Sequence, residues 1–477
     1  MPDVPLQIAV VGHTNAGKTS LLRTLTRNAR FGKVSNAPGT TRHAETIDLR
    51  FDGRTAVRFV DTPGLEDSVA LLSFLTNHPG DTKTERIRAF LRGPEAHGVF
   101  EQEAKVLRAL VTATDAGMLV IDTREPVLPK YRAEIEILSW CARPLMPVLN
   151  FVRDPASRRD EWHRALLESN LHARAEFDVV APSFGAEPQL YRDLGALLPE
   201  RREELADVIE ALALQQRQLR AAASRVAASV LIDVAAMRRS ERGKSAEPFL
   251  REFRDAVRAH ADQGASELLE LFAFRPGDAE LTDLPELSGR WTDDLFNSEL
   301  LKRAGTRLGW GAAVGAGVGA AVDVVTAGLS LGAATAIGAT LGGAVSGGWR
   351  PLWHKLGNRI SGVRELTVEE PVLLLLAERL CRLGSALALR GHGAQHSLRV
   401  GDAGADDALP DALRDTIEQL APARGHAEWE RGQRGFKDDA DRALLQDRVA
   451  DKLLPLLAEP VAAVERLPSH DGAAALK

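Results

Sequence analysis

The chain has 477 residues, of which 44% are hydrophobic and 26% are charged, and its formal net charge is −6. This is the composition of a globular protein of two or three domains, and it excludes a global basic field that would recruit nucleic acid. Cys141 and Cys381 stand far apart in the sequence, which favours a reducing compartment over a disulfide framework. The first residues lack the basic and apolar regions of a signal peptide, so we expect a cytoplasmic protein.

The first part of the chain alternates short apolar runs with amphipathic stretches. Strands are expected over residues 6–11, 42–51, 55–60, 116–121, 145–149 and 177–181. Helices are expected over 18–27 and 130–140. This alternation predicts an α/β domain over residues 1–192, with a mainly parallel sheet covered by helices on both faces.

The remainder of the chain is expected to be mostly α-helical. We expect a helical domain over 193–304, a Gly-rich hydrophobic hairpin over 305–350 and a C-terminal helical region over 351–477. A helix is predicted over 366–389 and a loop over 391–407.

The first of these helices carries a heptad pattern. Between Leu205 and Val230, apolar and small residues recur at alternating steps of four and three residues. This pattern fits a helix that packs within its own domain, and it also fits an intermolecular coiled coil.

A phosphate-binding motif follows the first predicted strand. The sequence GHTNAGKT matches GxxxxGKS/T between a strand and a helix, which is the context this motif requires. Glycines let backbone N–H groups approach phosphates, and the helix N-terminus adds partial positive charge. We expect Lys18 to bridge β- and γ-phosphate oxygens and Thr19 to bind magnesium. The residues expected to contact the nucleotide here are Gly12, Asn15, Ala16, Gly17, Lys18, Thr19 and Ser20.

Two further sequences complete the expected site. DTPG closes a predicted strand, so that Asp61 can hold magnesium through water and the N–H of Gly64 can sense the γ-phosphate. PGTTR lies between the two motifs, and the hydroxyl of Thr40 or Thr41 can complete the magnesium shell when the γ-phosphate is present. The predicted catalytic groups are therefore Lys18, Thr41 and Gly64.

GHTNAGKTS, PGTTR and DTPG together resemble the TrmE–Era-like branch of the translation-factor class of P-loop GTPases, over about the first 190 residues. The resemblance implies GTP or GDP with magnesium as ligands. It implies that Asn15 helps coordinate a potassium ion, as in the potassium-dependent members. Leu65 stands where Ras-like proteins carry a catalytic glutamine, so we expect slow intrinsic hydrolysis.

The motif for base recognition departs from this family. Its members read guanine with Asn-Lys-x-Asp, whereas this chain has NFVRD, which lacks the lysine and places the aspartate one position late. Asn150 and Asp154 are the expected base contacts if the loop bulges by one residue, and discrimination between GTP and ATP is weak if it does not. Ser183 stands where a backbone N–H normally meets the guanine oxygen.

The whole layout also resembles an uncharacterised group of bacterial GTPases, in which a helical region of unknown function follows the G domain. The segment between Gly64 and Glu103 is longer than a switch II region needs. It fits a lid, a dimer contact or an effector surface, and it equally fits an insertion with no catalytic role.

The stretch 308–348 is rich in Gly, Ala and Val, and its only charge is Asp323. Glycines recur at four-residue spacing, and basic residues flank both ends, which fits a hairpin of two spans entered from the cytoplasmic side. Ala and Gly are weakly hydrophobic, so a buried soluble hairpin fits the same residues.

These patterns predict a GTP-driven switch that is peripheral to, or inserted at, the cytoplasmic face of the inner membrane. Its partners would be a protein effector, the membrane through 308–348 and a second copy in a nucleotide-dependent dimer, whereas nucleic acid is not expected. The alternatives are an RNA- or ribosome-associated GTPase and a nucleotide-binding scaffold with negligible turnover.

Overall fold

The computed structural model of the chain describes residues 4–28, 45–179, 182, 185–242, 246–274, 363–389 and 411–458. The chain divides into two compact units, Met1–Arg217 with Leu389–His396 and Gln218–Ala388 with Ser397–Lys477. Four predicted features lie outside the described residues: the PGTTR sequence with Thr40 and Thr41, Ser183, the stretch 308–348 and the loop 391–407.

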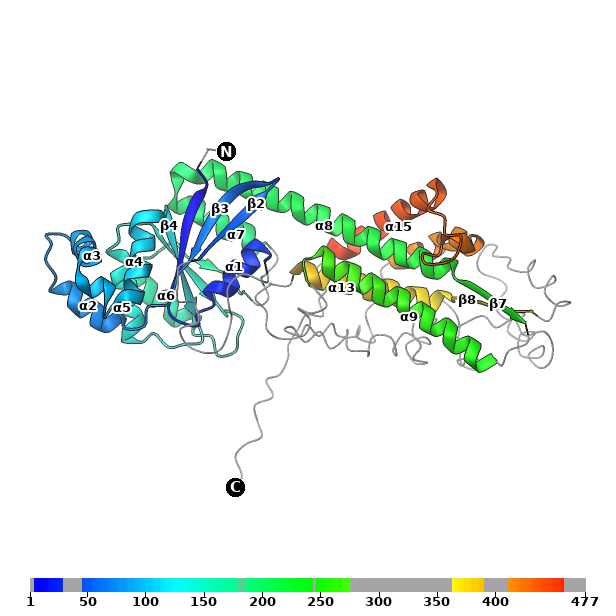
Figure 1. Cartoon of the computed structure of the whole chain (residues 1–477), viewed down its shortest axis with the longest axis horizontal. Coiled ribbons are helices and arrows are strands. Elements are labelled where there is room, and N and C mark those ends of the chain that lie inside the picture. Colours follow the sequence, from blue (N-terminus) through cyan, green and yellow to red (C-terminus); the bar gives the residue numbers. More distant parts are fainter. Residues whose placement is uncertain are drawn as a thin grey trace, which may run out of the picture. The chain divides into compact units, whose positions relative to one another are not determined.

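The first unit is built on a six-stranded sheet with the strand order β2-β3-β1-β4-β5-β6 (Figure 1). Its strands are β1 (Leu6–Val11), β2 (Glu45–Phe51), β3 (Arg54–Asp61), β4 (Ala116–Asp122), β5 (Leu145–Asn150) and β6 (Ala175–Glu176). Neighbouring strands run parallel except β2, which pairs antiparallel with β3. The expected mainly parallel sheet is therefore confirmed.

The last strand lies earlier than predicted. β6 ends at Glu176, whereas the apolar run suggested 177–181, of which residues 180 and 181 lie outside the described ranges. Phe177 still donates its N–H to the carbonyl of Leu149, but the N–H of Val179 donates to the side chain of Asn150 instead of to a strand. A side-chain acceptor therefore ends the ladder, and a hydrophobicity pattern does not contain that information.

Helices cover both faces of the sheet, as expected (Figure 1). One face packs against α1 (Lys18–Thr26), α7 (Ala186–Leu197) and the start of α8 (Arg202–Ala236), which follows a short 3-10 turn at Pro199–Arg201. The other face packs against α2 (Ser68–Thr76), α3 (Lys83–Arg92), α4 (Glu101–Ala113), α5 (Pro129–Ser139) and α6 (Arg159–Glu168). Strand β1 is buried on both sides, which is why it reads as a continuous apolar run.

The long segment after DTPG is an ordered insertion. It folds into α2, α3 and a 3-10 turn at Pro94–His97 before α4 begins. A capping box of Thr82 and Glu85 starts α3. The rings of Phe74, Phe90 and Phe100 lie with centroids 5.6–6.2 Å apart, which packs the insertion around an aromatic centre of its own.

The second unit is mainly helical. It comprises the later part of α8, then α9 (Ala246–Leu271), α13 (Glu370–Leu389), α14 (Asp411–Gln419) and α15 (Ala440–Ala458), with 3-10 turns at Ala421–Gly425 and Ala427–Trp429. A two-stranded antiparallel sheet joins β7 (Arg238–Arg242) to β8 (Val363–Thr367). The expected helical C-terminal region is confirmed, but the helix predicted from residue 366 begins at Glu370, because Leu366 and Thr367 pair with β7.

Heptad positions of α8 are buried against cores of this same chain. Leu205 and Leu212 belong to the core of the first unit, and Ala223 and Val230 belong to that of the second. Within the ranges that the structure describes, no helix is long and apolar enough to cross a membrane.

A buried charge cluster ties the helices of the second unit together. Asp233 of α8 accepts hydrogen bonds from Arg431 and Arg442, and Glu430 accepts from Arg239 of β7 and contacts His260 of α9. Together with the surrounding apolar core, these pairs connect α8, β7, α9 and α15.

Candidate functional site

The GHTNAGKT sequence forms the turn between β1 and α1, and α1 begins at Lys18. Gly17 has φ +98°, and a Cβ there would lie 2.4 Å from Nδ2 of Asn150, so a side chain does not fit. The ammonium of Lys18 donates to the carbonyls of Gly12 and His13, at 2.8 and 2.9 Å. Burial lowers the pKa of Lys18, and Asp61 and Glu134 act in the opposite direction.

The two expected magnesium ligands lie in direct contact. Thr19 donates its hydroxyl to Asp61 Oδ2 over 2.7 Å, and Asp61 is 1% exposed. Oδ1 of Asp61 has no hydrogen-bond partner in the described part of the chain, and burial raises the pKa of this carboxyl. A hydroxyl and a buried, incompletely satisfied carboxylate beside Lys18 fit a hydrated magnesium ion, which typically takes few protein ligands.

The glycine of DTPG packs directly on the P-loop. A Cβ on Gly64 would lie 2.6 Å from the backbone nitrogen of Thr14 and 2.5 Å from its hydroxyl, so only glycine allows this approach. The next residue, Leu65, is fully buried in the core beneath the insertion. Its side chain has no polar group to orient water, in agreement with its apolar character in the sequence.

The residues that follow are held from two sides. The backbone N–H groups of Glu66 and Asp67 donate to Glu103 of α4 over 3.3 and 3.1 Å. The hydroxyl of Ser68, at the start of α2, donates to the backbone carbonyl of Lys130 on α5 over 2.6 Å. The DTPG glycine is thus joined to the insertion through a short, fully tethered segment.

Asn150 connects three parts of the site. It is fully buried, and its Nδ2 donates to the carbonyl of Ala16 over 3.0 Å. Its Oδ1 accepts from the N–H groups of Phe151 and Val179, over 2.9 and 3.1 Å. The side chain therefore fixes the P-loop to β5 and to the segment after β6.

Asp154 lies in the loop that follows. Its Oδ1 accepts from the N–H of Ala156 over 2.8 Å, and its Oδ2 lies 3.9 Å from the guanidinium of Arg124. That guanidinium also lies 3.7 Å from the ring centroid of Phe151, whose φ is +58°. Arg124 was not singled out by any sequence pattern, and the contact of Asp154 with guanine stays a prediction.

The other predicted P-loop residues differ in exposure. Asn15 is exposed and has φ +66°, whereas Ala16 and Ser20 are buried beneath the loop.

Three charged or polar residues behind the P-loop escaped sequence reasoning. Nζ of Lys130 lies 3.0 Å from Nε2 of His13, and Oε2 of Glu134 lies 3.9 Å from Nδ1 of the same imidazole. Burial, together with the ammonium groups of Lys130 and Lys18, lowers the pKa of His13 to about 4, so a neutral imidazole accepts from Lys130. The signal was the spacing of Lys130 and Glu134, which places both on one face of a predicted helix.

Residues 163–451 match a family model described as "Domain of unknown function (DUF3482)", and residues 7–151 match one described as "50S ribosome-binding GTPase". The chain is 45% identical over 64 residues to the probable GTP-binding protein EngB of Neisseria meningitidis serogroup B (strain ATCC BAA-335 / MC58), covering 13% of this chain and 29% of that protein. It is 32% identical over 173 residues to the GTPase Der of Xanthomonas oryzae pv. oryzae (strain MAFF 311018), covering 35% and 33%.

Among solved structures, the chain is similar to an Era variant of Aquifex aeolicus bound to GDP and AlF4−. The sequence identity is 20%, the TM-score is 0.26, and the match covers 36% of this chain and 50% of that one. The chain spans about a third or less of the length of the curated relatives named above. Residues 7–151 form a P-loop GTPase domain, and the chain as a whole belongs to the family described as "Domain of unknown function (DUF3482)".

Proposed function

We propose that this protein is a magnesium-dependent GTP switch that hydrolyses GTP slowly. The contact of Thr19 with Asp61, beside the buried ammonium of Lys18, is the observation that carries the proposal. In the bound state, Lys18 turns from the loop carbonyls to the phosphates, and magnesium lies between the hydroxyl and the carboxylate. Asn150 keeps the P-loop in place while the nucleotide and the magnesium ion bind.

The switch arises where Gly64 meets the P-loop. A γ-phosphate accepts from the N–H of Gly64, and its loss removes that contact. Because Glu103 and the backbone carbonyl of Lys130 hold the next residues, a shift of Gly64 passes into α2 and α4. The insertion is then the part of the G domain that responds to the nucleotide.

Slow hydrolysis and potassium dependence are proposed for separate reasons. Leu65 is buried and has no polar group that orients water, so the activation barrier of hydrolysis is lowered mainly by positive charges beside the phosphates. Asn15 is exposed at the rim of the P-loop, where an amide oxygen can help to coordinate a monovalent cation. Potassium then adds positive charge that the described residues do not supply.

Hydrolysis by the full chain tests the proposal. GTP and ATP are each supplied in potassium and in sodium, with Lys18→Ala as the inactive control. Three results together support a potassium-stimulated GTPase. Potassium stimulates GTP turnover, Asn15→Ala makes that turnover insensitive to potassium, and Lys18→Ala abolishes it. Equal turnover of ATP shows that NFVRD does not select guanine, and tight binding without turnover shows a nucleotide-binding scaffold.

We further propose that residues 308–348 attach the protein to a membrane surface. The support is the sequence, in which a long stretch with a single charge is flanked by basic residues. Val318→Asp places a charge within this stretch, which costs roughly 2.5–3.5 kcal/mol at a span centre and lowers binding about 100-fold. Flotation with anionic liposomes measures this, and equal flotation of both proteins contradicts insertion.

A ribosomal partner is the second candidate. It rests on the family that residues 7–151 match, which is described as "50S ribosome-binding GTPase". Co-sedimentation with isolated large ribosomal subunits, in the presence of GDP or of a non-hydrolysable GTP analogue, tests it. Binding that requires the triphosphate form supports a ribosome-directed switch, and no binding in either state eliminates it.

A further inference from the structure

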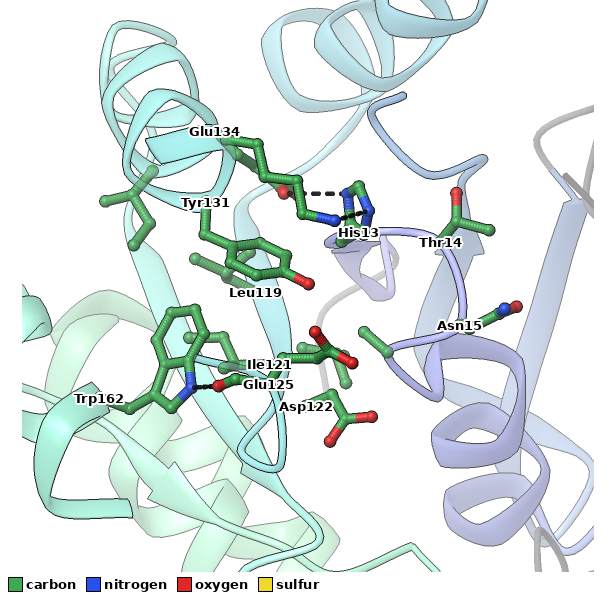
Figure 2. A pocket seen from close by; sticks show the side chains of 14 residues that line it. His13, Thr14, Asn15, Leu119, Ile121, Asp122, Glu125, Tyr131, Glu134 and Trp162 are labelled. Carbon is green, nitrogen blue, oxygen red and sulfur yellow. Dashed lines mark hydrogen bonds and ion pairs between the residues drawn. The ribbon is translucent and has the colours of Figure 1, made fainter. Parts of the chain in front are cut away.

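A cavity lies against the P-loop, at the carboxyl end of β4 and beside α5 (Figure 2). Its volume is about 220 Å³. Its apolar wall includes Leu119, Ile121, Ile135 and Trp162. Figure 2 shows the Asn15 side chain turned away from this space, on the side of the loop where α1 begins. The cavity is lined by the P-loop residues from His13 to Ala16 but not by Lys18, Thr19 or Asp61, so it adjoins the expected phosphate site without including its magnesium ligands.

The cavity contains a buried carboxylate with an unused oxygen. Glu134 is 2% exposed, and its Oε1 has no hydrogen-bond partner among the residues with described positions. Its Oε2 lies 3.9 Å from Nδ1 of His13. Burial raises the pKa of this carboxyl to about 8, although the ammonium groups of Lys18 and Lys130 act against that shift. A buried acid with an unpaired oxygen destabilises the fold unless a donor occupies the space beside it.

The rest of the polar lining is more acidic than basic. Figure 2 shows the hydroxyl of Tyr131 and the carboxylates of Glu125 and Asp122 facing the same space. Arg124 pairs with Asp122 over 2.7 Å, which leaves the carboxylate of Glu125 to be balanced. Glu134, with a pKa of about 8, is mostly protonated near neutral pH, and it ionises when a bound ammonium lies beside it. Among the described lining residues, Lys130 is the one group with a full positive charge, and it is already shared with His13.

Aromatic rings complete the chemistry of the cavity. The rings of Tyr131 and Trp162 lie edge to face, with centroids 5.4 Å apart. An ammonium group is attracted both to carboxylates and to the faces of aromatic rings, whereas its carbon skeleton favours an apolar wall. An inorganic metal site does not fit, because the described residues contain no group of three or more His, Cys, Asp or Glu side chains arranged for one.

We propose that this cavity binds a small organic cation, a primary amine or a guanidine on an apolar body. The charged group lies between Glu134 and the hydroxyl of Tyr131, and the apolar body packs on Leu119 and Trp162. The cavity is smaller than the roughly 300–1,000 Å³ of sites for drug-sized ligands, so the ligand has about one ring or a short chain. Such a ligand shares a wall with the phosphate site, so its binding and that of nucleotide are expected to influence each other.

Isothermal titration of the full chain with three matched probes tests the site. 2-Phenylethylamine is a cation, 2-phenylethanol is its neutral counterpart, and phenylacetate is an anion of similar size. We expect the amine to bind at least 10-fold more tightly than the alcohol, and phenylacetate not to bind. Equal affinity for amine and alcohol overturns the proposal, because the cavity would then be a general apolar one, and so does the absence of amine binding at millimolar concentration.

Substitutions then locate the bound amine. Glu134→Gln keeps the shape of the side chain and removes its charge, and it is expected to weaken amine binding at least 10-fold, since a hydrogen bond to a charged group is lost. Glu136→Gln is the matched control, because Glu136 lies on the same helix in an exposed pair with Lys83 and outside the cavity. Tyr131→Phe is a second test, with an expected loss of at least threefold. Unchanged affinity in both Glu134→Gln and Tyr131→Phe places the amine elsewhere and overturns the assignment.

The readout is independent of GTP turnover. Thermal unfolding and binding of fluorescent GDP show whether each variant is folded before it is titrated. If the protein hydrolyses no GTP but binds the amine through Glu134, the proposed amine site holds and the proposed GTPase function fails. If it hydrolyses GTP but does not bind the amine, only the proposed amine site fails.

Discussion

Replacing Asp233 by alanine is expected to destabilise the second unit by about 3–5 kcal/mol, the usual cost of breaking a buried ion pair by removing one partner. Asp233 is fully buried on α8, and it accepts from the backbone N–H of Arg431 over 3.2 Å and from its Nε. It also accepts from Arg442 over 2.8 Å. Arg442 is 3% exposed, so its guanidinium cannot turn to water when the carboxylate is lost. Its remaining partners include the neutral hydroxyl of Ser229 and the carboxylate of Asp438.

Urea unfolding followed by far-UV circular dichroism measures the effect. Because the chain has two compact units, the transition of the second is fitted separately from that of the first. Asp447→Ala is the control, since its pair with Arg225 is 53% and 63% exposed and is worth about 0–1 kcal/mol. A loss below about 1 kcal/mol for Asp233→Ala, or one equal to that of the control, refutes the view that this carboxylate holds the helices together.

Three further changes test the G domain. Gly64→Ala places a methyl group 2.6 Å from the nitrogen of Thr14, so affinity for a GTP analogue is expected to fall at least 10-fold while affinity for GDP changes little. Titration with fluorescent nucleotides measures both affinities, and an equal fall in both would contradict this expectation. Gly17→Ala, at φ +98° and 2.4 Å from Asn150, is expected to lower the Tm and the affinity for both nucleotides, and unchanged values of both would show that the loop tolerates a side chain. The carboxyl of Glu134 has a folded-state pKa of about 8 against its usual 4.5, so the folded state holds a proton that the unfolded state releases between these values. Stability therefore falls as pH rises through that window, by at most about 1.4 kcal/mol per pH unit from one proton, and Glu134→Gln should flatten the slope measured by urea unfolding at pH 5.5 and 8.

Much of the first unit follows from short-range patterns. The apolar runs at β1, β4 and β5 predict buried parallel strands because both faces of such strands are covered. The start of α1 at Lys18 follows from the glycine-rich turn before it. Errors arise where a distant group decides a boundary. The side chain of Asn150 ends β6, and pairing with β7 turns residues 363–367 into a strand instead of the first turn of α13.

The candidate site divides in the same way. The contact of Thr19 with Asp61 was predictable. The parallel strands β1 and β3 are neighbours, so the start of the helix that follows β1 and the carboxyl end of β3 lie at the same edge of the sheet. The surroundings of Asp154 were not, since they depend on Arg124 and on the ring of Phe151, which arrive from different strands. The four-residue spacing of Lys130 and Glu134 places both on one face of a predicted helix, but their contacts with His13 depend on the packing of α5 against the P-loop.

The charge cluster of the second unit is a case in which the sequence predicts a buried ion pair but does not identify the basic residue of that pair. Ser229 to Met237 is a run of buried residues in which Asp233 is the only charge, and a carboxylate in such a run requires a compensating donor. The donors prove to be Arg431 and Arg442, 198 and 209 residues further along the chain, and Arg442 lies on a helix whose many charges suggest an exposed surface. Composition cannot separate that arginine from its exposed neighbours, because only the tertiary fold decides which of them is desolvated. An isolated acid in an apolar helix therefore predicts that a buried ion pair exists, and the structure is needed to identify its other half.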